Sequence, residues 1–231
     1  MPEMTMRIIA GLVALAVLMW VEAGNAQTAY SLSVSRHSAV PVLSEGDVEQ
    51  ILTRASRMLQ NNSKFPCNVT FTLKGPIRTF ASPDTPVVNR RNIKAVHQVD
   101  SDLTDVNFHV KLVEQIRYCR PGLPRGLFEG CSYSPPDFRS MILVHPKLHK
   151  DLDGQPVSNY PDHLLWPHEF GHLSGLGHRR DQHGREHALM TPCSLVPFSG
   201  HPDTDVEINR KECRRLLSGP GAQAAPPFGC Q

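Results

Sequence analysis

The sequence has no apolar run long enough to cross a membrane and no strong excess of one charge. Its one long apolar run, Ile8 to Val21, has 14 residues, and a membrane-spanning helix needs about 18 to 20. The formal net charge is only +2, from 24 Lys and Arg against 22 Asp and Glu. The basic residues also stand in short, separate groups, so nucleic acid is not an expected partner.

The apolar run has the length and position of the hydrophobic region of a secretory signal peptide. Arg7 precedes it, and the small residues of EAGNAQ follow it. We therefore predict a signal peptide over residues 1–26. The mature chain, Gln27 to Gln231, is expected to be secreted or periplasmic, with no stable membrane association after cleavage. An uncleaved anchor is the alternative, because Glu3 offsets the charge of Arg7.

The cysteines show no CxxC pair or other close spacing typical of structural zinc sites. All six follow the predicted cleavage point: Cys67, Cys119, Cys131, Cys193, Cys213 and Cys230. This favours disulfides formed in an oxidising compartment, with free buried thiols as the alternative. The sequence cannot decide the full pairing. Cys119 and Cys131 would close a short loop, and they are the local pair that we predict.

The order of the predicted elements indicates an α+β fold rather than alternating β-α-β units. Strands are predicted for residues 30–35, 67–75, 77–80, 106–118 and 141–145. Helices are predicted for residues 44–60, for the segment from about 164 that carries the motif described below, and for residues 204–217. The strand at 77–80 is expected to pair with the one at 67–75 after a Gly-Pro turn. Asp203 or Thr204 is the expected cap of the last helix.

The chain length suits one domain with its own core. We expect this domain to cover residues 27–217, after the signal peptide. A tail rich in Gly, Pro and Ala is expected to follow over residues 218–231.

The segment HEFGHLSGLGH, residues 168–178, contains three histidines at offsets of zero, four and ten. On a helix His168 and His172 share a face, so both imidazoles can reach one metal ion. Gly175 can take the left-handed conformation that ends a helix, and the chain can then return His178 to the same ion. Three neutral histidines leave one coordination position open for water, which is the arrangement of catalytic zinc.

Glu169, beside the first histidine, is the predicted catalytic residue. It can accept a proton from a zinc-bound water, so that hydroxide attacks a carbonyl group polarised by the same ion. It can then pass this proton to the leaving amine. The residues thus predict zinc-dependent hydrolysis of a peptide bond.

Pro167 directly precedes the motif and bears on where the helix begins. A proline inside a helix removes a hydrogen bond and costs about 3 kcal/mol, whereas the first turn accepts it without penalty. We therefore expect the helix to begin close to Trp166, or to be kinked there, rather than to run on from Pro161.

HEFGHLSGLGH resembles the HExxHxxGxxH signature of the metzincin zinc endopeptidases, and the motif is closest to that of the matrixin branch. The segment 187–192, HALMTP, is similar to the methionine-bearing turn of that family. The resemblance implies a metzincin-like catalytic domain with a twisted mixed sheet, an active-site helix and a C-terminal helix. It also implies that Met190 is a non-ligating floor beneath the three histidines. Arg179 follows the third histidine, where other residues are usual, which leaves the branch open.

The resemblance further implies a polypeptide substrate that lies extended and antiparallel along an edge strand. Residues 193–199 would then form an apolar wall of the pocket for the substrate residue after the cut. The leading hypothesis is an exported zinc endopeptidase. The alternatives are a metzincin-fold binding protein that holds zinc without cleaving peptides, and a disulfide-stapled interaction domain without metal.

Asp151-Leu-Asp153-Gly154 is compatible with the start of a calcium-binding loop, with Asp162 at the twelfth position. Pro156 occupies the sixth position, where the calcium loop of an EF-hand requires glycine. We therefore favour a simple Asp-Gly turn over bound Ca²⁺.

Overall fold

The computed structural model describes residues 27–119, 127–133, 139–150, 155, 161–179, 187–190 and 206–221. The predicted signal peptide, the Asp-Gly turn at 151–154 and the predicted pocket wall at 193–199 lie outside these residues. Within the described ranges, no helix combines the length and the apolar character that a membrane span requires.

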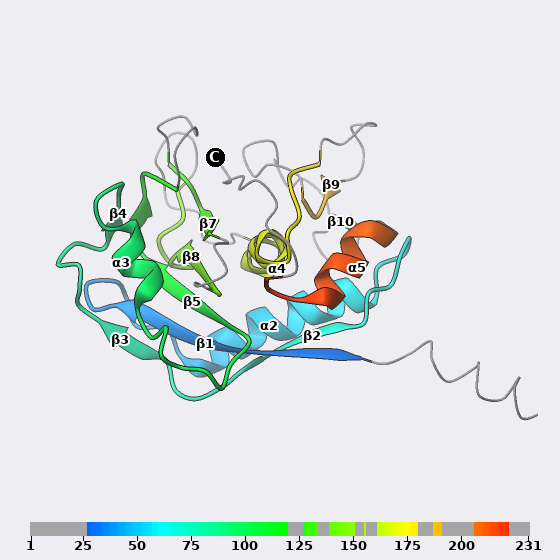
Figure 1. Ribbon diagram of the computed structural model, residues 1–231, viewed down its shortest axis with the longest axis horizontal. Helices are drawn as coiled ribbons and strands as arrows, with labels where there is room; N and C mark the ends of the chain where they lie inside the picture. The colour runs from blue at the N-terminus through cyan, green and yellow to red at the C-terminus, as the bar shows by residue number, and fades with distance from the viewer. Residues whose placement is uncertain are drawn as a thin grey trace, which may run out of the picture.

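A six-stranded mixed sheet forms the centre of the fold (Figure 1). Its strands are β1 (Thr28–His37), β2 (Val69–Leu73), β3 (Arg78–Phe80), β5 (Phe108–Val113), β7 (Gly130–Tyr133) and β8 (Ser140–Val144). Their order is β2-β1-β5-β8-β7, with β3 also beside β1. All these pairings are parallel except that of β7 with β8. This mixed sheet agrees with the predicted α+β class.

Four helices and two short strand pairs complete the described part of the chain. The helices are α2 (Glu45–Gln60), α3 (Ile93–Gln98), α4 (Asp162–Leu173) and α5 (Arg210–Ser218). The short pairs join β4 (Val87–Val88) to β6 (Gln115–Ile116), and β9 (His187–Ala188) to β10 (Val206–Glu207). Figure 1 shows α4 end-on between the sheet and α5, with α3 on the other side of the sheet.

Helix α2 forms where the sequence predicts it. Ser44 and Asp47 make a capping box, each side chain bonding the other residue's backbone N–H at 3.1 Å, which satisfies donors that the first turn leaves unpaired. Val48, Leu52 and Leu59 recur at helical spacing and are buried. The cap and the apolar face are both local signals, which explains why this helix was predictable.

The sheet separates two hydrophobic clusters, because successive side chains of a strand point to opposite faces. The face with α2, α4 and α5 buries the larger cluster, which includes Val110 and Met141. The face with α3 buries a smaller one, which includes Val113 and Ile142. Each cluster contains one disulfide.

The pairing predicted for the strand at 77–80 is wrong. Both β2 and β3 pair in parallel with β1, through residues 28–32 and 35–37 of that strand. Gly75 has a positive φ of 75°, and Lys74 N donates to Leu32 O at 2.8 Å. The Gly-Pro segment therefore interrupts the strand beside β1 without reversing the chain.

Helix α4 starts at Asp162, so the predicted start close to Trp166 is wrong. The amides of Leu164 and Leu165 donate to Pro161 O at 2.8 and 3.1 Å, and Pro167 lies inside the helix. All twelve residues of α4 are buried. Burial of the first turn in the core offsets the hydrogen bond that Pro167 cannot make.

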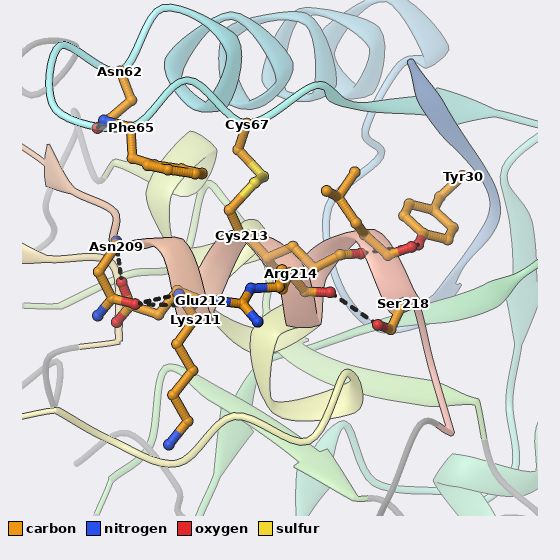
Figure 2. The surroundings of a disulfide bond; sticks show 12 residues. Tyr30, Asn62, Phe65, Cys67, Asn209, Lys211, Glu212, Cys213, Arg214 and Ser218 are labelled. Carbon is orange, nitrogen blue, oxygen red and sulfur yellow. Dashed lines mark hydrogen bonds between the residues drawn. A yellow bond between two sulfur atoms is a disulfide. The ribbon is translucent and has the colours of Figure 1, made fainter. Parts of the chain in front are cut away.

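The last helix, α5, begins at Arg210 and not at the predicted residue 204, because residues 206–207 form β10 instead. Asn209 is its cap: its side chain accepts from the amides of Lys211 and Glu212 at 2.9 Å. Glu212 returns a bond to the amide of Asn209 at 2.8 Å, as Figure 2 shows. This capping box begins the helix at Arg210. The predicted caps, Asp203 and Thr204, lie outside the described residues.

Two disulfides lie in the described residues. Cys119 pairs with Cys131, as predicted, and Cys67 pairs with Cys213, a pair not predicted. Figure 2 shows Cys67 joined to Cys213 on α5, and Tyr30 at the far end of that helix. The Tyr30 hydroxyl donates toward the carbonyls of Leu216 and Leu217, 2.9 and 2.8 Å away. Disulfides indicate a location outside the cytoplasm.

Candidate metal centre

The three motif histidines converge on one point. The Nε2 atom of His172 lies 3.1 Å from Nε2 of His168 and 3.1 Å from Nε2 of His178. Two tetrahedral ligands at the usual zinc–nitrogen distance would be about 3.3 Å apart. Among the described residues, these three form the cluster of potential ligands that can hold a metal ion.

Hydrogen bonds made by the Nδ1 atoms of His168 and His172 determine where their Nε2 atoms point. Nδ1 of His168 lies 2.6 Å from Leu189 O, and Nδ1 of His172 lies 2.8 Å from Leu176 O. A carbonyl oxygen only accepts hydrogen bonds, so Nδ1 of each ring carries the hydrogen. In a neutral ring, Nε2 then has a lone pair, and the lone pairs of His168 and His172 face each other. Such lone pairs repel each other unless a cation lies between them. The residues therefore fit a metal ion, although the geometry does not identify which one.

Burial keeps these rings suited to metal binding. His168 is 3% exposed and His172 is 5% exposed. Burial lowers the pKa of His168 to about 4, and the bond to Leu189 O opposes this only in part. A neutral imidazole is the form that binds a metal ion.

The end of α4 brings the third histidine to the other two. Gly175 has a φ of 83°, the left-handed conformation predicted for it, and its amide donates to His172 O at 2.9 Å. The amide of Leu176 donates to Gly171 O, also at 2.9 Å. Together these bonds form a Schellman motif, which ends the helix and reverses the chain direction. His178 is thereby returned toward the face that carries His168 and His172.

Glu169, the predicted catalytic residue, is fully buried beside β7. The Ser132 hydroxyl lies 2.6 Å from its Oε2 atom and 2.8 Å from its backbone oxygen. Burial raises the pKa of the Glu169 carboxyl to about 8, and the bonds from Ser132 oppose this shift. The structure thus places a carboxyl group on the residue next to His168, a potential metal ligand, and its catalytic role stays a prediction.

Sequence reasoning missed Ser132 and Gly130 as neighbours of Glu169. They lie 37 and 39 residues before it, in a strand whose flanking segments carry no recognisable motif. Only the alternation of a strand would have placed residues 130 and 132 on one face. Nothing in the sequence indicates that this face meets α4.

Met190, the predicted floor of the site, is fully buried under α4. A Cβ atom added to Gly171 would lie 2.5 Å from Met190 Sδ, so the absent side chain of this glycine makes room for the sulfur. The neighbouring Leu189 supplies the carbonyl that holds His168. The segment 187–190 therefore packs against α4, while the role of Met190 beneath a bound metal ion stays a prediction.

Arg179 connects the chain after His178 to the C-terminal part of the fold. Its backbone N–H donates to Met190 O at 2.8 Å. Its guanidinium group lies 3.1 Å from Glu207 Oε1 and 3.0 Å from Glu212 Oε1. Arg179 thus joins the chain after His178 to the methionine-bearing segment, β10 and α5. This explains why a basic residue follows the motif here.

Asp162, at the twelfth position of the calcium loop considered above, bonds a histidine. Its Oδ1 atom lies 3.1 Å from Nε2 of His149, whose Nδ1 bonds Glu129. Burial would lower the pKa of His149, but bonds to the two carboxylates raise it to about 9. Asp162 therefore serves in the described residues as one partner of a buried imidazolium.

Comparisons with known proteins add little to this geometry. No protein-family model matches the chain, and no curated protein matches it in sequence. The chain is similar to one in a solved structure described as "Structure of a chaperone-substrate complex", with a TM-score of 0.47 and 12% sequence identity. The match covers 83% of this chain but only 34% of that one. A likeness of this degree carries no inference about function.

Proposed function

We propose that this chain is an exported zinc endopeptidase of the metzincin type, in which His168, His172 and His178 hold the zinc and Glu169 is the catalytic base. The observation that carries the proposal is the convergence of three Nε2 atoms with a buried carboxyl group on the next residue of the same helix. A zinc ion bound there would act as a Lewis acid and lower the pKa of water.

The residues of the chain have distinct tasks in this reaction. Leu189 O and Leu176 O hold the rings of His168 and His172 in the tautomer that offers Nε2. In its ionised form, the Glu169 carboxyl accepts the proton of the attacking water and returns it to the leaving amine. A cation held by the three histidines would favour this ionised form and so oppose the rise in pKa that burial causes. Three protein ligands leave the fourth of the usual zinc positions for the reactants.

The sheet supports a polypeptide as the substrate. Strand β7 pairs with β8 on one side, contacts α4, and is the last strand of the sheet order in the described residues. An extended peptide can add to such an edge through backbone hydrogen bonds. Peptide hydrolysis beside α4 would follow from that placement.

A zinc assay combined with a cleavage assay tests the proposal. Residues 27–231 would be produced in an oxidising compartment, and zinc per chain and cleavage of an unbiased peptide library would be measured for the wild type and for Glu169→Gln. We expect one zinc in both proteins and cleavage by the wild type alone, because the amide cannot accept the proton. Glu45→Gln, at an exposed position of α2, is the control and should cleave normally.

One zinc without cleavage by either protein would contradict the endopeptidase and favour the non-catalytic zinc-binding alternative. A chain without zinc would contradict both and leave the disulfide-stapled domain.

A further inference from the structure

Strand β7 holds the Glu169 side chain through one hydroxyl group. Ser132 is 3% exposed, and its Oγ atom contacts both the carboxylate and the backbone oxygen of Glu169, at 2.6 and 2.8 Å. The other carboxylate oxygen, Oε1, has no hydrogen-bond partner among the described residues. Ser132 is therefore the described donor to this buried carboxylate.

The same strand leaves a space for the carboxylate at Gly130. A Cβ atom added there would lie 2.3 Å from Glu169 Oε1 and 2.6 Å from its Cδ and Cγ atoms. Real Cβ atoms do not approach so closely, so any larger residue would displace the whole carboxyl end of Glu169. Residues 130 and 132 point to the same face of the strand, and together they fix where the carboxylate lies.

The intervening residue fixes the strand itself. Cys131 points to the opposite face, where its disulfide with Cys119 lies in the smaller hydrophobic cluster. Strand β7 is also paired to β8 from Gly130 to Tyr133. The donor and the space for the carboxylate are thus carried by a strand that is held on its other face and along one edge.

We propose that Ser132 and Gly130 are positioning residues, which hold the Glu169 carboxylate where it accepts the proton of the attacking water. This inference rests on the proposed hydrolytic function. It predicts that changes at either residue lower the rate of the chemical step without removing the metal, because neither residue contacts the three histidine ligands through any described bond.

The matched variants Ser132→Thr and Ser132→Val have nearly the same shape and differ in the hydroxyl group. We expect both to retain one zinc per chain and a KM close to that of the wild type. The valine variant should lose about 100-fold in kcat, the loss typical of a catalytic group misplaced by about 1 Å, and the threonine variant should restore most of it. Equal kcat values in an active enzyme would overturn the proposal.

Gly130→Ala tests the second positioning residue. We expect zinc to stay bound and kcat to fall by a similar factor, because the new Cβ occupies the place of the carboxylate. The control is Gly46→Ala in α2, where the nearest atom to an added Cβ is 3.9 Å away. It should leave kcat unchanged. Normal turnover by Gly130→Ala would overturn the role of this glycine.

A stability measurement tests the Ser132–Glu169 contact without relying on activity or on the fit of a larger side chain. Ser132→Ala would be introduced into the wild type and into Glu169→Ala, and the denaturation midpoints of all four proteins compared. The shift caused by Ser132→Ala should be smaller when the carboxylate is absent. Equal shifts would overturn the contact, whereas a zinc-loaded wild type that cleaves nothing would overturn the proposed function and the positioning role with it.

Discussion

Both faces of the central sheet bury histidines, but they arrange the rings differently. On the face with α4, His168 and His172 bond backbone carbonyls through Nδ1, and their Nε2 atoms meet. On the face with α3, His109 bonds the Ser33 hydroxyl at 2.8 Å and His97 bonds the Ser140 hydroxyl at 3.0 Å. The first arrangement gathers lone pairs at one point, and the second pairs each ring with a separate serine.

The pKa values of these histidines do not distinguish the two faces. Burial lowers the pKa of His168 to about 4, that of His109 to about 4 and that of His97 to about 3. The face with α3 differs in holding a buried cation, Lys111, which lowers the pKa values of His109 and His97 further. A metal ion would be repelled by this charge. A buried neutral histidine is thus a potential ligand only where other lone pairs converge with it and no cation competes.

The largest predicted effect is on zinc affinity, and it is tested by two separate variants that each remove one histidine from a different face. His172→Ala removes the Nε2 atom that lies 3.1 Å from Nε2 of His168 and 3.1 Å from Nε2 of His178. We expect zinc affinity to fall by more than the 10- to 100-fold typical of losing only a hydrogen-bond partner of a ligand. His109→Ala should lower stability but leave one zinc per chain. Zinc analysis after dialysis, with circular dichroism to verify folding, measures both.

Two results would contradict this difference between the faces. One is the presence of one zinc per chain in folded His172→Ala, which would show that the three-histidine cluster is not the metal centre. The other is loss of zinc from folded His109→Ala, which would show that the face with α3 contributes to metal binding.

The two disulfides offer the next comparison, since one lies in each hydrophobic cluster. Cys67 and Cys213 are 146 residues apart, whereas Cys119 and Cys131 are 12 apart. In the chain-entropy model, the longer loop contributes about 5 kcal/mol and the shorter about 3 kcal/mol to the free energy of unfolding. Urea denaturation of the two paired Cys→Ala variants should show this order, and the reverse order would contradict the model.

The sequence predicted those features that depend on neighbours along the chain. The helix at 45–60 followed from its Ser44 cap, and the Cys119–Cys131 pair from its short loop. The convergence of His168, His172 and His178 followed from their spacing, because a separation of four residues and a helix-ending Gly175 determine where the rings can go. In each case the residues that carry the signal lie within about 20 positions of one another in the sequence.

The features that were missed depend on packing between distant segments. The first turn of α4 forms despite Pro167 because the core buries it, and β3 pairs with β1 because the sheet order places it there. Ser132 meets Glu169 only because β7 is added antiparallel at the edge beside α4. No local pattern carries such information, so the positioning residues emerged from the fold alone.

The smallest predicted effect is a pH dependence that belongs to the face with α3. Lys111 is fully buried, with Nζ 3.6 Å from Asp100 Oδ2. Burial lowers its pKa from 10.5 to about 8, and the attraction of Asp100 opposes this only in part. Asp100 itself has a lowered pKa: burial would raise it, but bonds from Ser35 and Arg78 and the charge of Lys111 outweigh burial.

The sign of the effect follows from proton binding in the two states. Between pH 8 and pH 10.5 the unfolded chain keeps the Lys111 proton that the folded chain releases. The free energy of unfolding should therefore rise with pH in this window, by at most about 3 kcal/mol. Lys111→Met should remove this rise, so urea denaturation of the two proteins should give curves that converge as pH increases. Parallel profiles would contradict this prediction, because they would mean that Lys111 keeps its charge in the folded chain up to pH 10.5.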